Sequence, residues 1–152
     1  MNAMSQPVPS PSVHPVMDVT YREQVSPGGV NFNVLLSAMQ KCARRGMRDE
    51  MEFAVRELCA FLDVELGLIE GLCRCGGKQV TLGKSSVTNF LHRLAVIYLE
   101  DVHPAEPQIW HTVEGILKRM HESRTVEGRN EFLTCGVALC ELLTKGGHSR
   151  LY

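Results

Sequence analysis

Residues whose types and spacing could bind a nucleotide lie in the loop "CGGKQVTLGKSS", Cys75 to Ser86. Gly83-Lys84-Ser85 matches the end of the pattern G-x-x-x-x-G-K-[ST], in which successive backbone N–H groups surround phosphates. The first glycine of that pattern falls at residue 78, which is a lysine, and Gly77 leaves one intervening residue too many. The loop should also follow a buried strand, whereas the preceding "LGLIEGLC" is more typical of a helix. We therefore expect no nucleotide here.

Glu100 and Asp101 end the apolar run "LAVIYLED", and paired carboxylates can act as a general acid and base. Adjacent residues on a helix point about 100° apart, so these two carboxylates do not converge on one site. The sequence also lacks a recognisable set of nucleophile, base and orienting group. We expect no catalytic residues, no enzyme activity and no small-molecule substrate.

Cysteine spacing gives little support for a bound metal. Cys73 and Cys75 could supply two zinc ligands, with others from Cys42, Cys59 or a histidine. Zinc sites usually combine two such pairs, and only one, with short spacing, is present. Cys135 and Cys140 are five residues apart and lie on different faces of a helix. We expect no metal and no cofactor.

The histidine most easily paired with a carboxylate is His111, three residues before Glu114 on an expected helix. Such a pair could contact a metal, but an exposed polar pair is the more usual arrangement at this spacing. We therefore interpret His111 and Glu114 as surface residues.

Positive charge gathers in two places. Lys41, Arg44, Arg45 and Arg48 crowd one helix end, and Lys118, Arg119, Arg124 and Arg129 surround a later turn. Such clusters usually form a solvated rim, although the first is also a candidate contact for phosphate or an acidic partner. Aromatic residues, which would stack on bases, are sparse among them. Nucleic-acid binding is therefore an alternative that the sequence does not favour.

The composition is that of one ordinary globular domain, with 152 residues, 44% hydrophobic residues and a net charge of −1. No apolar run reaches the length of a membrane span, and the N-terminus lacks the pattern of a signal peptide. The six cysteines are therefore expected to be reduced thiols in the cytoplasm or nucleus.

The N-terminal 17 residues contain no charged residue and four prolines, Pro7, Pro9, Pro11 and Pro15. Proline fixes φ and lacks an N–H donor, so this segment predicts an extended arm that contacts a partner. We divide the chain into an extended arm (1–30), a helical domain (31–147) and a C-terminal tail (148–152).

From Phe32 onward, apolar residues recur with helical spacing, which predicts an all-α bundle of five or six helices. Gly46 is expected to end the first helix, Asp49 to cap the second, and Ser85 or Ser86 to cap the fourth. A short helix is expected over 64–72, and Pro107 should lie in the first turn of the fifth. The expected inward faces are Phe32, Leu35, Leu36, Met39 and Ala43; Met51, Val55, Leu58 and Leu62; Val87, Phe90, Leu91, Leu94, Ile97 and Tyr98; Ile109, Trp110, Val113, Ile116, Leu117 and Met120; and Phe132, Leu133, Gly136, Leu139, Cys140 and Leu143.

Two stretches carry a resemblance to a known family. "LLSAMQKCARRGMRDEMEFAVREL" (35–58) resembles a hairpin with an S-A-x-x-K-x-x-R-G-x-D-like pattern, and "HRLAVIYLEDVHPAEPQ" (92–108) resembles an R-R-L-x-x-x-x-x-E-D-x-G-x-x-x-P helix. Both patterns are typical of the C-terminal region of the replication-associated recombination protein A family, whose members are AAA+ ATPases related to clamp loaders. The matching residues are Ser37, Ala38, Lys41, Arg45, Gly46 and Asp49, then Arg93, Leu94, Glu100, Asp101 and Pro107; His103 replaces the usual glycine, and the spacing before the proline differs.

In that family the matching region, about residues 31–143 here, is a helical oligomerisation domain, and the ATPase lies upstream. The resemblance therefore implies a helical fold and an association role without catalysis. It also implies that Arg93, Glu100 and Asp101 are structural, as buried ion-paired groups at helix contacts.

We accordingly expect a non-enzymatic helical subunit of a large assembly, which contacts its protein neighbours through the arm. A minor capsid or virion protein of a large DNA virus is one setting for such a subunit. The alternative is an accessory factor of DNA replication or repair that binds DNA through the basic clusters.

Overall fold

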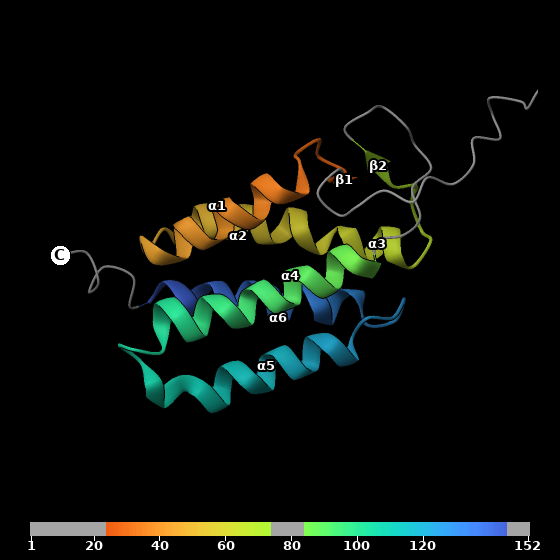
Figure 1. The fold of residues 1–152 in the computed structure, drawn as a ribbon. Helices are drawn as coiled ribbons and strands as arrows, with labels where there is room; N and C mark the ends of the chain where they lie inside the picture. The colour runs from red at the N-terminus through yellow and green to blue at the C-terminus, as the bar shows by residue number, and fades with distance from the viewer. Residues whose placement is uncertain (1–23, 74–83, 146–152) are drawn as a thin grey trace, which may run out of the picture.

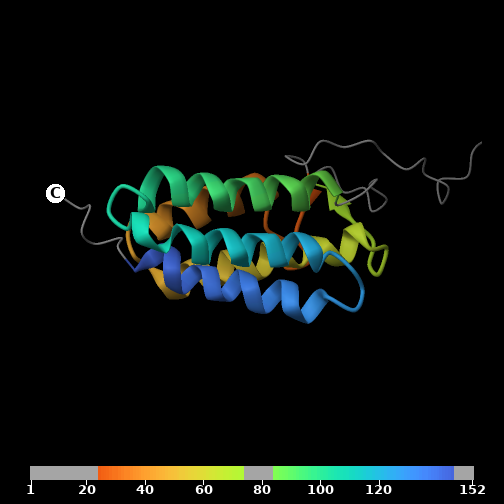
Figure 2. The same ribbon diagram turned by 90° about the horizontal axis from the view of Figure 1, so that it is seen from below.

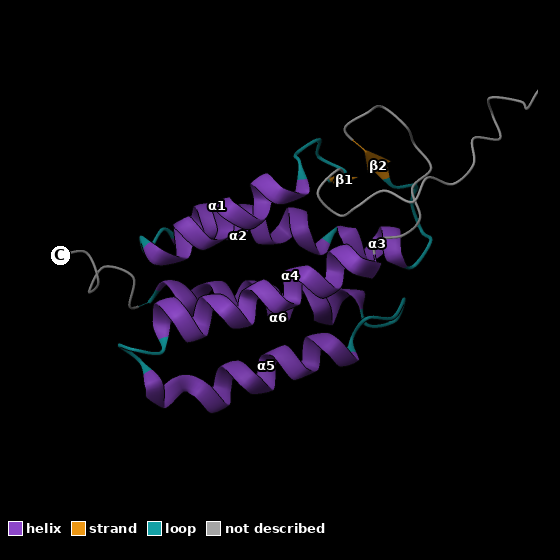
Figure 3. Ribbon diagram, viewed as in Figure 1, coloured by secondary structure: helices purple, strands orange, loops and turns teal. Residues whose placement is uncertain are grey.

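The computed structural model describes residues 24–73 and 84–145, which form an all-α bundle with one two-stranded β-ribbon. The helices run side by side along one long direction, as two perpendicular views show (Figure 1, Figure 2). The ribbon lies at one end of the bundle (Figure 3). The elements in chain order are β1 (Gln24–Val25), α1 (Phe32–Arg44), α2 (Arg48–Cys59), α3 (Phe61–Glu65), β2 (Leu72–Cys73), α4 (Lys84–Ile97), a π-helical turn (Tyr98–Val102), a 3₁₀ turn (Pro107–Ile109), α5 (Trp110–Glu122) and α6 (Arg129–Thr144). The predicted fold class is confirmed.

A tight turn between α1 and α2 makes them an antiparallel hairpin. Gly46 has a φ of 70°, and the N–H groups of Gly46 and Met47 donate to the carbonyls of Ala43 and Cys42. This is the Schellman arrangement, which favours glycine at the left-handed position, so the predicted role of Gly46 is confirmed. The prediction that Asp49 caps α2 is wrong: α2 begins at Arg48, its N-cap is Met47, two residues before the predicted cap, and Asp49 lies in the first turn.

The chain between α2 and α4 differs from the helix predicted over 64–72. α3 follows α2 almost without a break and covers Phe61–Glu65. Gly67, with a φ of 74°, lies in the turn after α3. Leu72 and Cys73 then pair antiparallel with Val25 and Gln24. A strand of two residues is too short to show the alternation of apolar and polar residues that identifies strands, so the sequence pattern does not distinguish it from a helix.

Residues 24–30, which the sequence prediction places in the arm, take part in the folded unit. After β1, the Ser26 N–H donates to the carbonyl of Val30, and the Ser26 hydroxyl donates to Glu57 Oε1 of α2 at 2.6 Å. Gln24 is buried and accepts a hydrogen bond of 2.5 Å from the hydroxyl of Ser86. The four arm prolines and the tail at 148–152 lie outside the described residues.

α4 begins at Lys84, so Ser85 and Ser86 lie in its first turn and not at its N-cap, which corrects that prediction. The residues of the nucleotide-like loop from 74 to 83 are outside the described part of the chain. Pro107 is the first residue of the 3₁₀ turn that leads into α5, as predicted.

The predicted apolar faces meet in one core between the helices. All the residues named for α1, α2 and α4 are buried, together with Leu62 of α3. Phe32 packs edge-on against Phe61 with ring centroids 5.1 Å apart, and Phe90 packs similarly against Phe132 at 6.3 Å. In α5 and α6 only Ile109, Trp110, Ile116 and Leu133 of the named residues are partly exposed. Among the described residues, no helix is both long and apolar enough to span a membrane.

Candidate functional site

The end of α4 widens into a π-helical turn that contains two neighbouring carboxylates, Glu100 and Asp101. Its marker is the hydrogen bond from the His103 N–H to the Tyr98 carbonyl, 2.6 Å across five residues. Within it, Asp101 is only 9% exposed, whereas Glu100 is exposed. π-Helical turns are uncommon and often mark functional positions, so this one is a natural starting point.

Asp101 is held by side chains of α1. Arg44 donates from Nε to Oδ1 at 3.3 Å and from Nη2 to Oδ2 at 3.4 Å. Gln40 donates to Oδ2 at 3.3 Å and accepts a bond of 3.2 Å from Nη1 of Arg93. A continuous polar network therefore links α4 to α1, and with it the two stretches that carry the family resemblance.

The three residues expected to be structural have different surroundings. Asp101 is buried and paired with a cation, and the half-buried Arg93 bonds to the neutral Gln40. Glu100 departs from the expectation of a buried ion pair, because the wide turn directs it to solvent. The network restrains the helix pair, but it contains no second carboxylate for metal or acid–base chemistry.

The first basic cluster divides into paired and unpaired members. Arg44 contacts Asp101, while Arg48 contacts Glu141 of α6 at 2.5 Å and Glu52 of its own helix at 2.9 Å. Lys41 and Arg45 are exposed, and the described residues offer them no ion-pair partner. The local excess of positive charge is therefore smaller than the sequence indicated.

In the second basic cluster, each arginine contacts a carboxylate from another element. Arg119 contacts Glu131, Arg124 contacts Glu65 at 2.5 Å, and Arg129 contacts Asp63 at 3.5 Å. The side chains of Arg124 and Glu65 are 16% and 15% exposed, which makes theirs the most buried of these pairs. Arg119 therefore connects α5 with α6, Arg129 connects α6 with α3, and Arg124 connects the α5–α6 loop with α3; among the described residues only Lys118 of this cluster has no ion pair.

Four cysteines of the described helices are free thiols that are at least partly buried. Cys59, Cys135 and Cys140 are buried and Cys42 is partly buried. Burial raises the pKa of Cys140 to about 12 and also raises the pKa of Cys59. Within the described ranges, no three His, Cys, Asp or Glu residues are placed to hold a metal ion. Cys75 lies outside those ranges, so they do not address the zinc alternative at Cys73 and Cys75.

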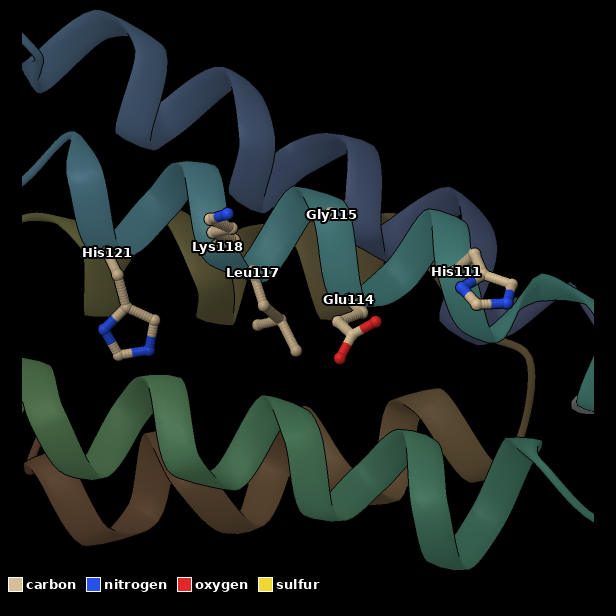
Figure 4. Close-up of a pocket in the computed structure, with 6 residues that line it drawn as sticks. All are labelled: His111, Glu114, Gly115, Leu117, Lys118 and His121. Carbon is tan, nitrogen blue, oxygen red and sulfur yellow. The ribbon is translucent and has the colours of Figure 1, made fainter.

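His111 and Glu114 lie on an exposed face of α5, next to two further polar residues that the sequence prediction does not group with them. Lys118 and His121 follow on the same face, and the four side chains line an open hollow of about 640 Å³ with Gly115 and Leu117 (Figure 4). The spacing of three, four and three residues is the signal in the sequence that identifies this group.

Large apolar side chains also remain exposed on the described surface. Phe53 is 60% exposed on the outer side of α2, and its neighbours Asp49, Glu52 and Arg56 border a shallow hollow with it. The others are Val34, Met47, Leu68, Ile69, Leu99 and Val126. Leu68 and Ile69 follow α3, and Val126 lies between α5 and α6; the pairs Glu65–Arg124 and Asp63–Arg129 connect α3 with the α5–α6 loop and with α6.

Comparison of the chain with known proteins finds no matching family model and no match among curated proteins or solved structures.

Proposed function

We propose that this chain is a non-enzymatic helical subunit that works by associating with protein neighbours. The observation that carries the proposal is Phe53, an aromatic ring 60% exposed within a helix whose flanking Glu52 and Arg56 are ion-paired at 2.8 Å. An aromatic side chain surrounded by polar groups is the usual composition of an energetically important contact between proteins. The proposal retains the association role that the family resemblance implies.

The N-terminal arm adds a second contact in this proposal. β1 anchors the chain where Gln24 is buried against Ser86, so the 23 preceding residues start from a defined point at one end of the bundle. A chain of that length extends up to roughly 75 Å. It could therefore reach a neighbour beyond the bundle, through the contacts we assign to Pro7, Pro9, Pro11 and Pro15. A virion subunit of a large DNA virus remains one setting for this role.

The test compares the assembly mass of the full chain with two variants, by light scattering after size exclusion. Deletion of residues 2–23 should leave the helical signal intact, since β1 is kept, and should reduce the assembly. Phe53→Ala should also reduce assembly without lowering the unfolding midpoint, because the ring is exposed. The control is Phe32→Leu at a buried position, which should lower the unfolding midpoint without a specific effect on assembly. Unchanged assembly in both association variants would contradict the proposal.

A second candidate, DNA binding by a replication or repair accessory factor, has one supporting observation. Lys41 and Arg45 are exposed on the last turn of α1 beside the half-exposed Arg44. We expect at most weak binding, since Arg44 and Arg48 already contact carboxylates. Binding that falls steeply with salt and is lost in Lys41→Ala/Arg45→Ala would favour this candidate instead.

A further inference from the structure

The exposed face of α5 has a symmetrical arrangement of polar groups. His111, Glu114, Lys118 and His121 follow one another at spacings of three, four and three residues. This is the a/d spacing of a heptad, which places side chains along one helix face that can meet a second helix. Figure 4 shows Glu114, Leu117 and His121 extending from α5 on the side where α4 lies.

These four residues are placed symmetrically about Ile116: a histidine lies at each outer position, and a charged residue, negative on one side and positive on the other, lies at each inner position. Glu114 lies two residues before Ile116 and Lys118 two residues after it. His111 and His121 lie five residues before and after the same point. If a second α5 lies antiparallel to the first with Ile116 at the level of the twofold axis, each Glu114 faces a Lys118.

Gly115 gives this face room for a second helix. A Cβ built on Gly115 meets no heavy atom of the described residues within 4 Å, so this position has no packing partner among them. The glycine lies in the interior of a 13-residue helix, where it lowers helix stability relative to alanine. Small residues on a helix face allow close approach of another helix, and the hollow of about 640 Å³ lies along the same face.

We propose that α5 is a self-association surface on which a second copy of the chain docks antiparallel, with Glu114 of each copy paired to Lys118 of the other. The inference rests on the proposed association function and names one partner for it, the chain itself.

Charge complementarity favours a second copy over another occupant. Glu114 and Lys118 are both exposed, and although they lie four residues apart they form no ion pair with each other or with the other described residues. A twofold axis pairs all four of these charges, because Glu114 of each copy then faces Lys118 of the other. A single 13-residue helix is about 20 Å long, so the interface is at the small end of specific contacts. We expect a reversible dimer whose population rises with concentration.

The test uses charge reversal in the full chain, followed by sedimentation equilibrium over a wide concentration range. Glu114→Lys gives two facing lysines at each symmetric contact, and Lys118→Glu gives two facing glutamates. Each single variant should dimerise at least about tenfold more weakly than the wild type, because facing like charges repel. Glu50→Lys makes the same change of charge on exposed α2, away from this surface, and should dimerise like the wild type.

Mixing the two single variants gives the decisive measurement. In a mixed dimer, the introduced lysine of one variant faces the introduced glutamate of the other, and the native Lys118 faces the native Glu114, so attraction is restored at both contacts. The equimolar mixture should recover wild-type dimerisation, and so should the double variant Glu114→Lys/Lys118→Glu. A monomeric wild type, single variants that dimerise normally, or a mixture that stays monomeric would each overturn the inference.

Failure of this inference can be told apart from failure of the proposed function. If α5 is not the surface but association is the function, the charge variants still form assemblies that depend on residues 2–23 and on Phe53. If association is not the function, neither the charge variants nor the arm deletion and Phe53→Ala change the mass of the particle.

Discussion

α5 and α6 each contain one glycine in the helix interior, and the two glycines have opposite surroundings. Gly136 of α6 faces α2, where an added Cβ would lie 3.1 Å from Cys59 Sγ and 3.1 Å from Val55 Cγ1. A Cβ at Gly115 of α5 would have no heavy atom within 4 Å in the described part of the chain. The glycine at 136 thus permits close packing within the monomer, whereas the glycine at 115 has no such packing role among the residues that the structure describes.

It follows that the two sides of the α5–α6 region differ in their contacts within the described structure. The inner side brings together α2 and α6 with buried thiols and a glycine contact. The outer side of α5 carries unpaired charges and an open glycine. Substitutions should therefore affect folding on the first side and association on the second.

The largest effect is expected from Gly136→Val. The new side chain overlaps Cys59 and the β-branched Val55, and overpacking of a core typically costs about 1–3 kcal/mol. Valine has a slightly higher helix propensity than glycine, which offsets only a few tenths of a kcal/mol, so we expect a loss of about 2–3 kcal/mol in the free energy of unfolding, measured by urea denaturation. Gly115→Val is the matched control and should change stability by less than about 0.5 kcal/mol. Equal losses of unfolding free energy in the two variants would show that the two glycines have similar surroundings, contrary to this prediction.

The next effect should come from two arginines whose ion pairs differ in burial. Arg124→Ala leaves Glu65 partly buried without its cation, which we expect to cost about 2 kcal/mol, below the value for fully buried pairs. Arg119→Ala removes a contact to Glu131 in which the two side chains are 61% and 42% exposed, so little change is expected. Thermal unfolding of both variants checks the order, and a larger loss for Arg119→Ala would contradict it.

Alkaline pH should destabilise the inner side through its thiols. Burial raises the pKa of Cys140 from 9.0 to about 12, so the unfolded thiol ionises first as the pH rises. The stability associated with this group is complete below pH 9 and is lost as the pH rises toward 12. Relative to pH 7, the wild type should lose about 1.4 kcal/mol more at pH 10 than Cys140→Ala. Parallel losses in the two proteins, measured by urea unfolding, would show that Cys140 does not contribute.

The smallest expected effect is an increase in the stability of the monomer. Gly115→Ala adds a methyl group in open space and removes the flexibility of a helical glycine, so the monomer should become more stable by about 0.5–1 kcal/mol. A loss of stability, measured at a protein concentration too low for dimers, would show that Gly115 is constrained within its own chain.

The helix faces could be predicted from the sequence because helical packing repeats with a fixed period. Phe32, Leu36 and Met39 are buried as their spacing indicates, since each helix buries one side. The pairing of Leu72 and Cys73 with β1 could not be predicted, because two-residue strands leave no alternation and depend on a partner distant in the chain.

The sites were harder to predict than the helices, for a physical reason. The environment of Asp101 depends on tertiary contacts with Gln40 and Arg44 of α1, which lie about 60 positions away in the chain. The carboxylate partners of Arg124 and Arg129 come from residues about 60 positions away, which spacing along one helix cannot reveal. The α5 face is readable from spacing, but the sequence prediction pairs only His111 with Glu114 and stops one helical turn short of Lys118.

The wide turn at the end of α4 has a consequence for chain length. A π-helical turn contains one residue more than an α-helical turn, so it absorbs an extra residue locally while the following segment keeps its position. Removal of the half-exposed Leu99 should convert the turn to a regular helix and leave Val102 and Pro107 near their present places. The polypeptide is therefore expected to tolerate a one-residue deletion here, inside a helix, where such a change normally rotates everything beyond it.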